Sequence, residues 1–181
     1  MIVWVNAAFG GGKTTLVSEL HRRRPDALVY DPEQIGYVLR EIVPVPNGNF
    51  QNLRLWRRQV VSMATGLLEE YGQPVLAPMT LVNPQYVAEI FGALADAGVT
   101  VHHFFLKVTR EELVRRIDAR VIVPDDPERE AAVRQWCKDQ IDECLAAADT
   151  LPADTVFLDG ERPTPDLADE VLARIGTRPA A

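Results

Sequence analysis

The chain has 181 residues, a formal net charge of −7 and a hydrophobic fraction of 47%. That length and apolar content fit one domain with an ordinary core and exclude a wholly disordered chain. The negative charge argues against nucleic acid and anionic membranes as partners. No apolar run reaches the ~20 residues that cross a bilayer, and residues 1–5 lack the cationic start of a signal peptide.

The predicted elements alternate between strand and helix from one end of the chain to the other. Apolar, β-branched runs predict strands at residues 2–7, 27–30, 74–79, 99–108 and 155–158. Helical periodicity and breaking prolines predict helices at 13–24, 33–43, 53–71, 84–97, 110–120, 128–148 and 165–175. Strands separated by helical crossovers imply an α/β fold, a five-stranded parallel sheet with helices on both faces.

Two helix starts carry capping residues. Asn83 followed by Pro84 is an N-cap with a proline at the first helical position. Thr109, with Glu112 three residues later, has the pattern of a capping box. Both patterns predict where the fourth and fifth helices begin.

The strongest motif lies between the first strand and the first helix. Residues 7–14 read AAFGGGKT, the pattern G-x-x-x-x-G-K-[ST] with Ala7 at its first position. Glycines allow successive N–H groups to face anionic oxygens, and the helix adds its positive dipole end. Lys13 would reach the β- and γ-phosphates, and Thr14 would hold Mg²⁺. We therefore predict an ATP site formed by Phe9, Gly10, Gly11, Gly12, Lys13, Thr14 and Thr15.

The alternative for this segment is a glycine-rich turn that binds nothing. Ala7 departs from the motif, and it would be strained if that position needed a positive φ. The strand before the loop, the helix after it and the Lys-Thr pair favour the phosphate-binding interpretation.

Two carboxylates follow the second predicted strand. Asp31 and Glu33 stand at its carboxyl end, where ligands bind in sheets of this kind. Asp31 there would take a proton from a substrate hydroxyl or hold a Mg²⁺-bound water. Its other interpretation is a helix N-cap before Pro32, and the two roles are compatible.

The third predicted strand ends in Met79 and Thr80, where many phosphate-loop enzymes place an aspartate for Mg²⁺. Either Thr80 and Asp31 hold the waters of the metal, or the metal is held loosely. The missing aspartate argues against a motor or transport ATPase, and the lack of an N-K-x-D motif argues against a GTPase.

Arginines mark two further candidate sites. Arg116 and Arg120 share one helix face before the polar loop 121–127, so they could bind phosphate or stack on adenine. We expect a mobile lid at about residues 116–134, although a solvated helix end explains the same pair. On the acceptor-side helices, about residues 33–71, Arg57 could hold the substrate with Trp56 as a stacking wall. The alternative is a core tryptophan beside a surface arginine.

Cysteines and histidines offer no metal site. Cys137 and Cys144 lie on one predicted helix, roughly 10 Å apart, which is too far for a disulfide. Reduced thiols suit a cytoplasmic protein. His102 and His103 alternate faces on a buried strand, and we expect them to be structural. No spacing among them matches zinc.

The chain resembles small nucleotide kinases among the phosphate-loop proteins. Arg116 and Arg120 look like the lid-entry arginine pair of adenylate-kinase relatives, and Asp31 looks like the acceptor-side aspartate of shikimate and antibiotic phosphotransferases. A closer resemblance, over nearly the whole length, is to the tunicamycin-resistance ATP-binding family. It rests on residues 2–6 (IVWVN), 9–14 (FGGGKT), 19–23 (ELHRR), 29–33 (VYDPE), 50–51 (FQ), 55–57 (LWR), 78–80 (PMT), 101–104 (VHHF) and 140–142 (QID). The resemblance implies ATP binding and resistance to a nucleoside antibiotic that carries a fatty acyl chain.

Three hypotheses follow for the function. The first is an ATP- and Mg²⁺-dependent phosphotransferase acting on a hydroxyl of a nucleoside-like substrate. Its catalytic residues would be Lys13, Asp31 and Arg120, and its metal would be held by Thr14 and Asp31. The substrate would be bound by Asp31, Glu33, Trp56, Arg57 and Thr80. The second is a nucleotide-gated protein that sequesters the antibiotic unchanged. The third is a housekeeping kinase for another small metabolite. The last predicted helix is acidic on its polar side, so we expect no peripheral membrane contact.

Overall fold

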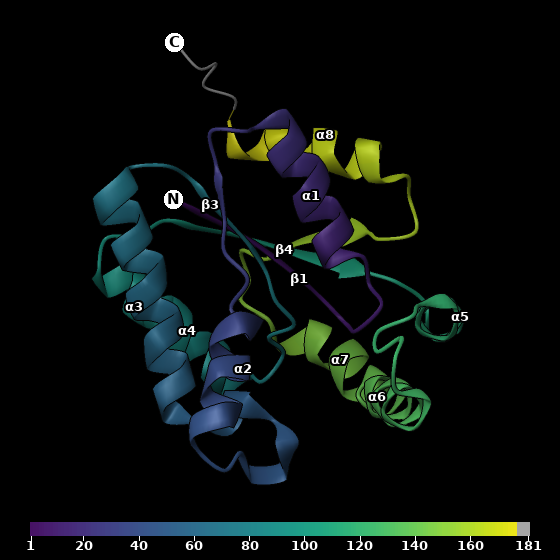
Figure 1. Ribbon diagram of the computed structural model, residues 1–181. Helices are drawn as coiled ribbons and strands as arrows, with labels where there is room; N and C mark the ends of the chain where they lie inside the picture. The colour runs from purple at the N-terminus through teal and green to yellow at the C-terminus, as the bar shows by residue number, and fades with distance from the viewer. Residues whose placement is uncertain (177–181) are drawn as a thin grey trace.

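The computed structural model describes residues 1–176, which form a single twisted parallel sheet with helices around it (Figure 1). The strands run in the order β2-β3-β1-β4-β5. Their bounds are Ile2–Ala7 for β1, Leu28–Val29 for β2, Val75–Pro78 for β3, Val101–Lys107 for β4 and Val156–Asp159 for β5. Every neighbouring pair is parallel, which confirms the predicted five-stranded sheet.

Eight α-helices are found within residues 1–176. They are α1 (Lys13–Arg23), α2 (Glu33–Ile42), α3 (Arg54–Tyr71), α4 (Pro84–Asp96), α5 (Arg110–Ala119), α6 (Pro127–Asp139), α7 (Ile141–Ala147) and α8 (Thr164–Ile175). Short 3-10 turns lie at Pro46–Gly48, Phe50–Asn52 and Ala148–Thr150. None of these helices combines the length and the apolar character that crossing a bilayer requires.

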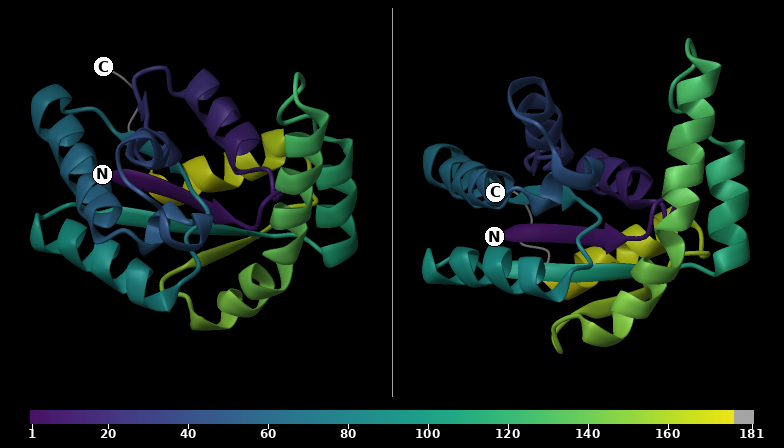
Figure 2. Two further views of the ribbon diagram at one scale, coloured as in Figure 1. Left: turned by 60° about the horizontal axis from the view of Figure 1, so that its bottom comes forward. Right: turned by 90° about the horizontal axis from the view of Figure 1, so that it is seen from below.

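Strand β1 lies at the centre of two cores. All six of its residues are buried, because helices cover both faces of the sheet. Ile2 and Trp4 point to the core beneath α3 and α4, whereas Val3, Val5 and Ala7 point to the core beneath α1 and α8. The two-residue period of the strand thus divides its side chains between the two layers, which the turned views separate (Figure 2).

A third core lies beyond the carboxyl ends of the strands. Figure 2 shows that the strand arrows point towards α5, α6 and α7, which stand across that edge of the sheet. Ala8 after β1 and Val108 after β4 pack there with Leu113 and Ile141. This arrangement encloses the loop between β1 and α1 on one side.

Three local predictions differ from the structure. The predicted helix 128–148 is interrupted at Gln140 and becomes α6 and α7, although no glycine or proline marks the break. The capping box at Thr109 is wrong, because Glu112 binds arginines of its own helix. The segment between the predicted helices 33–43 and 53–71, where a loop is expected, contains two 3-10 turns. The Asn83 cap is confirmed, since its Oδ1 accepts bonds from the N–H groups of Gln85 and Tyr86.

Candidate functional site

The loop between β1 and α1 has the backbone that a phosphate loop needs. Gly10 and Gly12 have φ of +80° and +93°, a region that glycine enters without strain. Ala7 stays in β1 with an ordinary φ, so its departure from the motif carries no backbone strain. A Cβ at Gly11 would lie 2.6 Å from the Ala7 Cβ, so Gly11 provides the room that Ala7 takes.

Lys13 lies against the carbonyl oxygens of this loop. Its Nζ donates to Ala8 at 3.1 Å and to Ala7 at 3.4 Å, and it stands 5.5 Å from the centre of the Phe9 ring. Burial lowers the pKa of Lys13. A phosphate would relieve that cost, because it supplies the opposite charge that a half-buried ammonium lacks.

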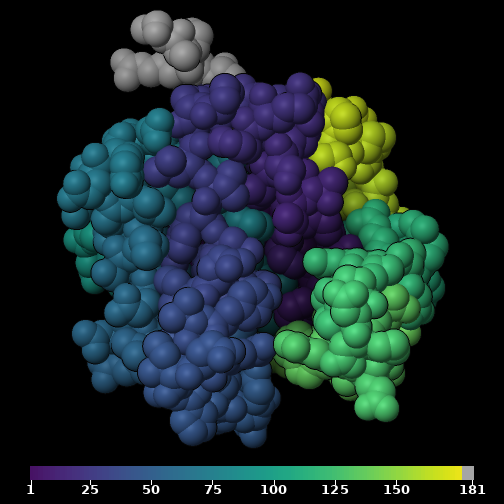
Figure 3. Space-filling model, in the orientation of Figure 1, coloured from purple at the N-terminus to yellow at the C-terminus, as the bar shows by residue number. Residues whose placement is uncertain are grey.

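The loop forms the floor of a cleft of about 920 Å³. One side, which we call the α2–α4 wall, consists of the lining residues in 31–52 and 78–86. The other side, the α6–α7 wall, consists of the lining residues in 120–144. In Figure 3 the purple start of the chain is visible at the bottom of the hollow between the blue and green masses.

Asp31 combines its two predicted roles on the α2–α4 wall. One carboxylate oxygen accepts a bond of 2.9 Å from the Glu33 N–H in the first turn of α2, and the side chain lines the cleft. Burial raises the pKa of Asp31, although the Glu33 N–H and the Lys13 charge oppose the rise. A raised pKa makes the carboxylate a better general base, because the pKa of an effective general base lies near the operating pH.

Buried hydrogen bonds fix the end of β3 against β1. The Thr80 hydroxyl donates to the Ala7 carbonyl at 2.8 Å, and Gln51 Nε2 donates to the Thr80 carbonyl at 2.7 Å. The Asn6 amide bonds both the carbonyl and the N–H of Leu81, at 2.6 and 3.0 Å. Thr80 therefore stands beside the phosphate loop with its hydroxyl already engaged.

His103 in β4 extends this network from Asn6 to Thr155, the residue just before β5. Its ring lies between the Asn6 amide at 3.2 Å and the Thr155 hydroxyl at 2.9 Å. Burial lowers the pKa of His103 to about 4, so the ring is neutral at physiological pH. This is the structural role that the strand alternation predicts for it.

Trp56 and Arg57 do not line the cleft. Trp56 is fully buried in the core, and its indole N–H donates to the Pro32 carbonyl at 3.1 Å. The prediction that Trp56 forms a stacking wall for the substrate is therefore wrong: Trp56 is a core residue that holds the start of α2. Arg57 bonds the Gln51 carbonyl and Glu89, both at 2.6 Å. It supports the wall from behind.

A second hollow of about 480 Å³ opens on the other side of the phosphate loop. Residues 10–16, Arg116, Arg120, Gly160 and Arg162 line it. Arg116 donates to Glu112 at 2.6 Å and to the Gly160 carbonyl at 3.1 Å. Arg120 lines both hollows, so it stands where they meet.

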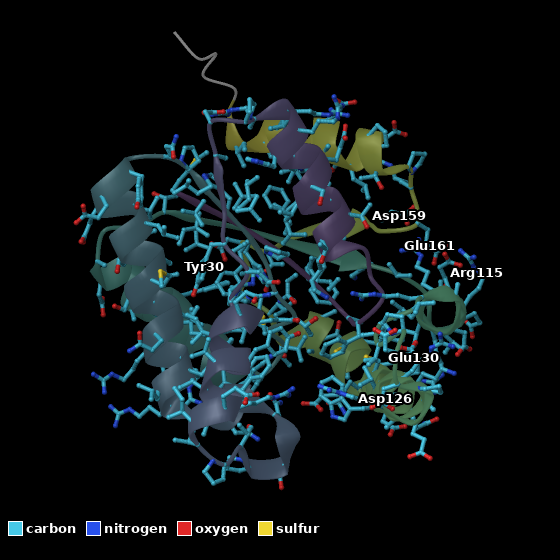
Figure 4. The ribbon with its side chains drawn as sticks, in the orientation of Figure 1. Tyr30, Arg115, Asp126, Glu130, Asp159 and Glu161 are labelled. Atoms are coloured by element: carbon cyan, nitrogen blue, oxygen red, sulfur yellow. The ribbon has the colours of Figure 1, made fainter. Side chains whose placement is uncertain are left out.

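The turn after β5 is fastened to the start of α5. Glu161, labelled in Figure 4, accepts bonds from the Thr109 N–H and hydroxyl at 2.8 and 2.6 Å. Gly160 is required there, because a Cβ would lie 2.6 Å from Val108. The same turn accepts the Arg116 bond through the Gly160 carbonyl, so it joins α5 to the second hollow at two points.

The α6–α7 wall is held by carboxylates at its rim. Glu130 accepts bonds from the N–H groups of Ile122 and Val123, at 2.9 and 2.5 Å, and pairs with Arg134 at 2.6 Å (Figure 4). Arg134 also donates to the Arg120 carbonyl at 2.7 Å. Arg129 lines the cleft, whereas Arg134 supports the loop that carries Arg120.

The structure brings most of the predicted site residues to the two hollows. The lining of one or both contains Phe9, Gly10, Gly11, Gly12, Lys13, Thr14, Thr15, Asp31, Glu33, Thr80, Arg116 and Arg120. Sequence reasoning did not select Gln51, Asn83 and Tyr86 on the first wall or Gly160 and Arg162 at the second hollow. The sequence signals at these positions are turn and capping patterns and, for Gln51, its place in the string FQ at 50–51, and none of these signals indicates a ligand.

The donor set fits a metal that arrives with a nucleotide. Within residues 1–176 no group of three His, Cys, Asp or Glu side chains is placed to hold a metal alone. Thr14 and Asp31 both line the cleft beside Lys13. Mg²⁺ commonly takes one or two protein ligands and completes its shell with phosphate oxygens and water, which is what these two side chains allow.

Comparison with known proteins places this geometry in a family. The sequence model of a family described as an AAA domain matches residues 5–144, which include the phosphate loop and most of the cleft. The chain belongs to this family. No curated protein matches it at a significant level.

Solved structures share the fold over almost the whole chain. The tunicamycin resistance protein of Deinococcus radiodurans is 21% identical, with a TM-score of 0.71, and the match covers 96% of this chain and 94% of that one. The APS kinase of Mycobacterium tuberculosis, in complex with AMPPNP and APS, is 18% identical with a TM-score of 0.64 and covers 96% of both chains. A gluconokinase of Sinorhizobium meliloti is 15% identical with a TM-score of 0.57, covering 94% of this chain and 89% of that chain. The resemblance noted from sequence is thus matched by a shared phosphate-loop kinase fold.

Proposed function

We propose that the protein is an ATP-dependent phosphotransferase that acts on a hydroxyl of a nucleoside-like antibiotic such as tunicamycin. The observation that carries this proposal is the meeting of two hollows at Lys13 and Thr14, with Asp31 in one and Arg116 in the other. Transfer of a phosphoryl group requires donor and acceptor to lie side by side, and one phosphate loop between two hollows suits that requirement. The tunicamycin resistance protein and the two kinases among the structural neighbours support it.

The proposed mechanism assigns each side chain a task. The nucleotide lies in the second hollow with its phosphates on the loop, and Arg116 and Arg120 lie over it. Asp31 accepts the proton of the acceptor hydroxyl, the acceptor oxygen bonds to the γ-phosphorus, and the bond from that phosphorus to the bridging oxygen of ADP breaks. Lys13 balances the charge that develops on the transferred group.

Mg²⁺ supplies further charge compensation on the phosphates when it is bound. Thr14 would contribute its hydroxyl, and Asp31 would hold a water of the metal shell. We propose residues 116–134 as the lid, since Arg120 and Arg129 both line the cleft from this segment. Cys137 and Cys144 are free and buried, which supports a location in the reducing cytoplasm.

Mass spectrometry of tunicamycin incubated with protein and ATP-Mg²⁺ tests the proposal. We expect the drug to gain one phosphoryl group, and Asp31→Asn to lower kcat by about 10²- to 10⁴-fold while the amide still accepts the Glu33 N–H. Asp96→Asn, at an exposed position at the end of α4, is the matched control. Unchanged drug under conditions where ATP binds would reject phosphoryl transfer.

The second candidate is a nucleotide-gated protein that binds the antibiotic and leaves it unchanged. Thr80 favours it, because this residue stands where many phosphate-loop enzymes have an aspartate and its hydroxyl is engaged by Ala7. This candidate predicts protection that saturates at one drug per protein and a recovered drug of unaltered mass.

A further inference from the structure

The α2–α4 wall carries an unusual share of amide side chains. Five of its lining residues are Asn47, Asn49, Gln51, Asn52 and Asn83. Amide side chains offer both hydrogen-bond donors and an acceptor, and they carry no charge that would attract a charged ligand. Apart from the helix cap at Asn83, the sequence motifs did not assign these residues a role, and the phosphoryl-transfer step proposed above does not use them.

Gln51 is the most constrained of the five. The residue is 9% exposed, and its main chain is held on both sides: its N–H donates to Asn49 Oδ1 at 3.0 Å, and its carbonyl accepts from Arg57 at 2.6 Å. Because the Thr80 carbonyl accepts bonds and donates none, the Gln51 nitrogen must face it. The Gln51 Oε1 atom is therefore fixed in orientation.

That oxygen is an acceptor in need of a donor. Among residues 1–176 no hydrogen bond to Gln51 Oε1 is found, and the atom is not completely buried. Because Gln51 lines the cleft, we infer that Oε1 is accessible from it. Largely buried polar atoms in proteins are almost always hydrogen-bonded. A ligand at this wall would supply an O–H or N–H group to Oε1.

The charges of the same wall oppose an anionic ligand. Its acidic side chains are Asp31 and Glu33, and Arg40 is its one cation among the residues described. Arg40 is already engaged, since it donates to the Gly48 carbonyl at 2.7 Å and lies 5.1 Å from the centre of the Phe50 ring. A phosphate, sulfate or carboxylate held against this wall would thus lie beside two carboxylates, while the other cations of the cleft, Lys13, Arg120 and Arg129, belong to its floor and its opposite wall.

The aromatic faces that would favour an ammonium ligand are also occupied. The Arg40 guanidinium lies 5.9 Å from the centre of the Tyr37 ring, and that of Arg57 lies 4.2 Å from the centre of the Tyr86 ring. A ligand cation would have to displace these arginines to gain the same attraction. Apart from the carboxylates of Asp31 and Glu33, what remains available on the wall is hydrogen bonding to uncharged groups.

We propose that Gln51 is a specificity-determining residue, and that the site accepts an uncharged polyhydroxy compound whose hydroxyl donates to Gln51 Oε1. This inference rests on the function proposed above for the choice of which wall holds the acceptor. It requires binding only, so it is tested apart from phosphoryl transfer.

Isothermal titration calorimetry with AMPPNP and Mg²⁺ present tests the charge preference of the unmodified protein. The probes are tunicamycin and two matched series: uridine, uridine 5′-monophosphate and 5′-amino-5′-deoxyuridine; and glucose, glucose 6-phosphate and glucosamine. We expect at least one uncharged probe to bind. In at least one series, the uncharged member should bind at least about tenfold more tightly than its charged analogues. Tighter binding of an anionic or cationic member, or binding of AMPPNP with no uncharged probe bound, would overturn the proposal.

Gln51→Met tests the residue itself, because it keeps the side-chain volume and removes both polar atoms. We expect the affinity for the uncharged probe to fall about tenfold, because the hydroxyl of the bound probe would lose its acceptor and be left unpaired in the cleft. The AMPPNP affinity should change less than twofold. Gln59→Met, at an exposed position on α3, is the matched control. Unaltered affinity for the probe in Gln51→Met would refute the role of Gln51, and the comparison of charged and uncharged probes stands even if this variant does not fold.

Discussion

The two walls of the cleft are held in place by different interactions. The α2–α4 wall is tied to β1 and β3 by buried, uncharged hydrogen bonds, of which Gln51 to Thr80 and Asn6 to Leu81 are the clearest. The α6–α7 wall packs on the third core through Cys137, Ile141 and Cys144, and its rim is held by partly exposed ion pairs such as Lys138 with Asp118. Breaking a buried hydrogen bond leaves an unpaired group, whereas an exposed pair contributes little and is screened by salt. We therefore expect the first wall to be preformed and the rim of the second wall to open more readily.

The network behind the first wall makes protein stability depend on pH. His103 has a pKa of about 4 in the folded chain and an ordinary value near 6.5 when unfolded, so the unfolded state binds more protons between these values. We expect the free energy of unfolding to fall by about 3 kcal/mol as the pH drops from about 6.5 to about 4. Urea denaturation at several pH values measures it.

Two variants isolate His103 from other titrating groups. His103→Gln should lose this part of the pH dependence, and the difference from the unmodified protein cancels the opposite contribution of Asp31, whose raised pKa favours folding at lower pH. His102→Gln changes the opposite face of β4 and should keep the dependence. Parallel profiles for His103→Gln and the unmodified protein would contradict the assignment.

Packing of the first wall gives the next largest effect. Gly36 in α2 lies under Phe50, and a Cβ there would come within 2.5 Å of the ring. We expect Gly36→Ala to cost about 2 kcal/mol, because the ring belongs to a turn held on several sides and has little room to shift. Gly66→Ala in α3, where nothing lies within 4 Å, should instead stabilise by up to about 1 kcal/mol. Equal thermal stability of the two variants would show that the wall yields to the added methyl group.

The same contrast separates what the sequence could predict from what it could not. The sheet, the phosphate loop and the Asn83 cap follow from local patterns, because strand alternation, glycine conformations and capping residues act within a few positions of one another. Gln51 and Thr80 are far apart in the chain, and Glu161 caps α5 from a distance of 52 residues. No local pattern marks such partners.

Trp56 shows the limit most directly. A tryptophan beside arginines on a helix is compatible with a binding wall and with a core, and the choice depends on which face of α3 meets the sheet. The structure buries it completely and gives its N–H to Pro32. Its contribution to the site is indirect, since it fixes the start of the helix that follows Asp31.

The smallest expected effect lies on the second wall, at Glu130. Glu130→Gln removes the charge that accepts the N–H groups of Ile122 and Val123, while it leaves one acceptor oxygen and most of the packing. We expect amide hydrogen exchange at these two residues to accelerate severalfold with little change in the melting temperature, because only the loop that carries Arg120 opens more often. Glu128→Gln, in the exposed first turn of the same helix, is the matched control. If exchange sped up equally across α2 and the turn that contains Gln51, the two walls would open as one unit and the contrast between them would be wrong.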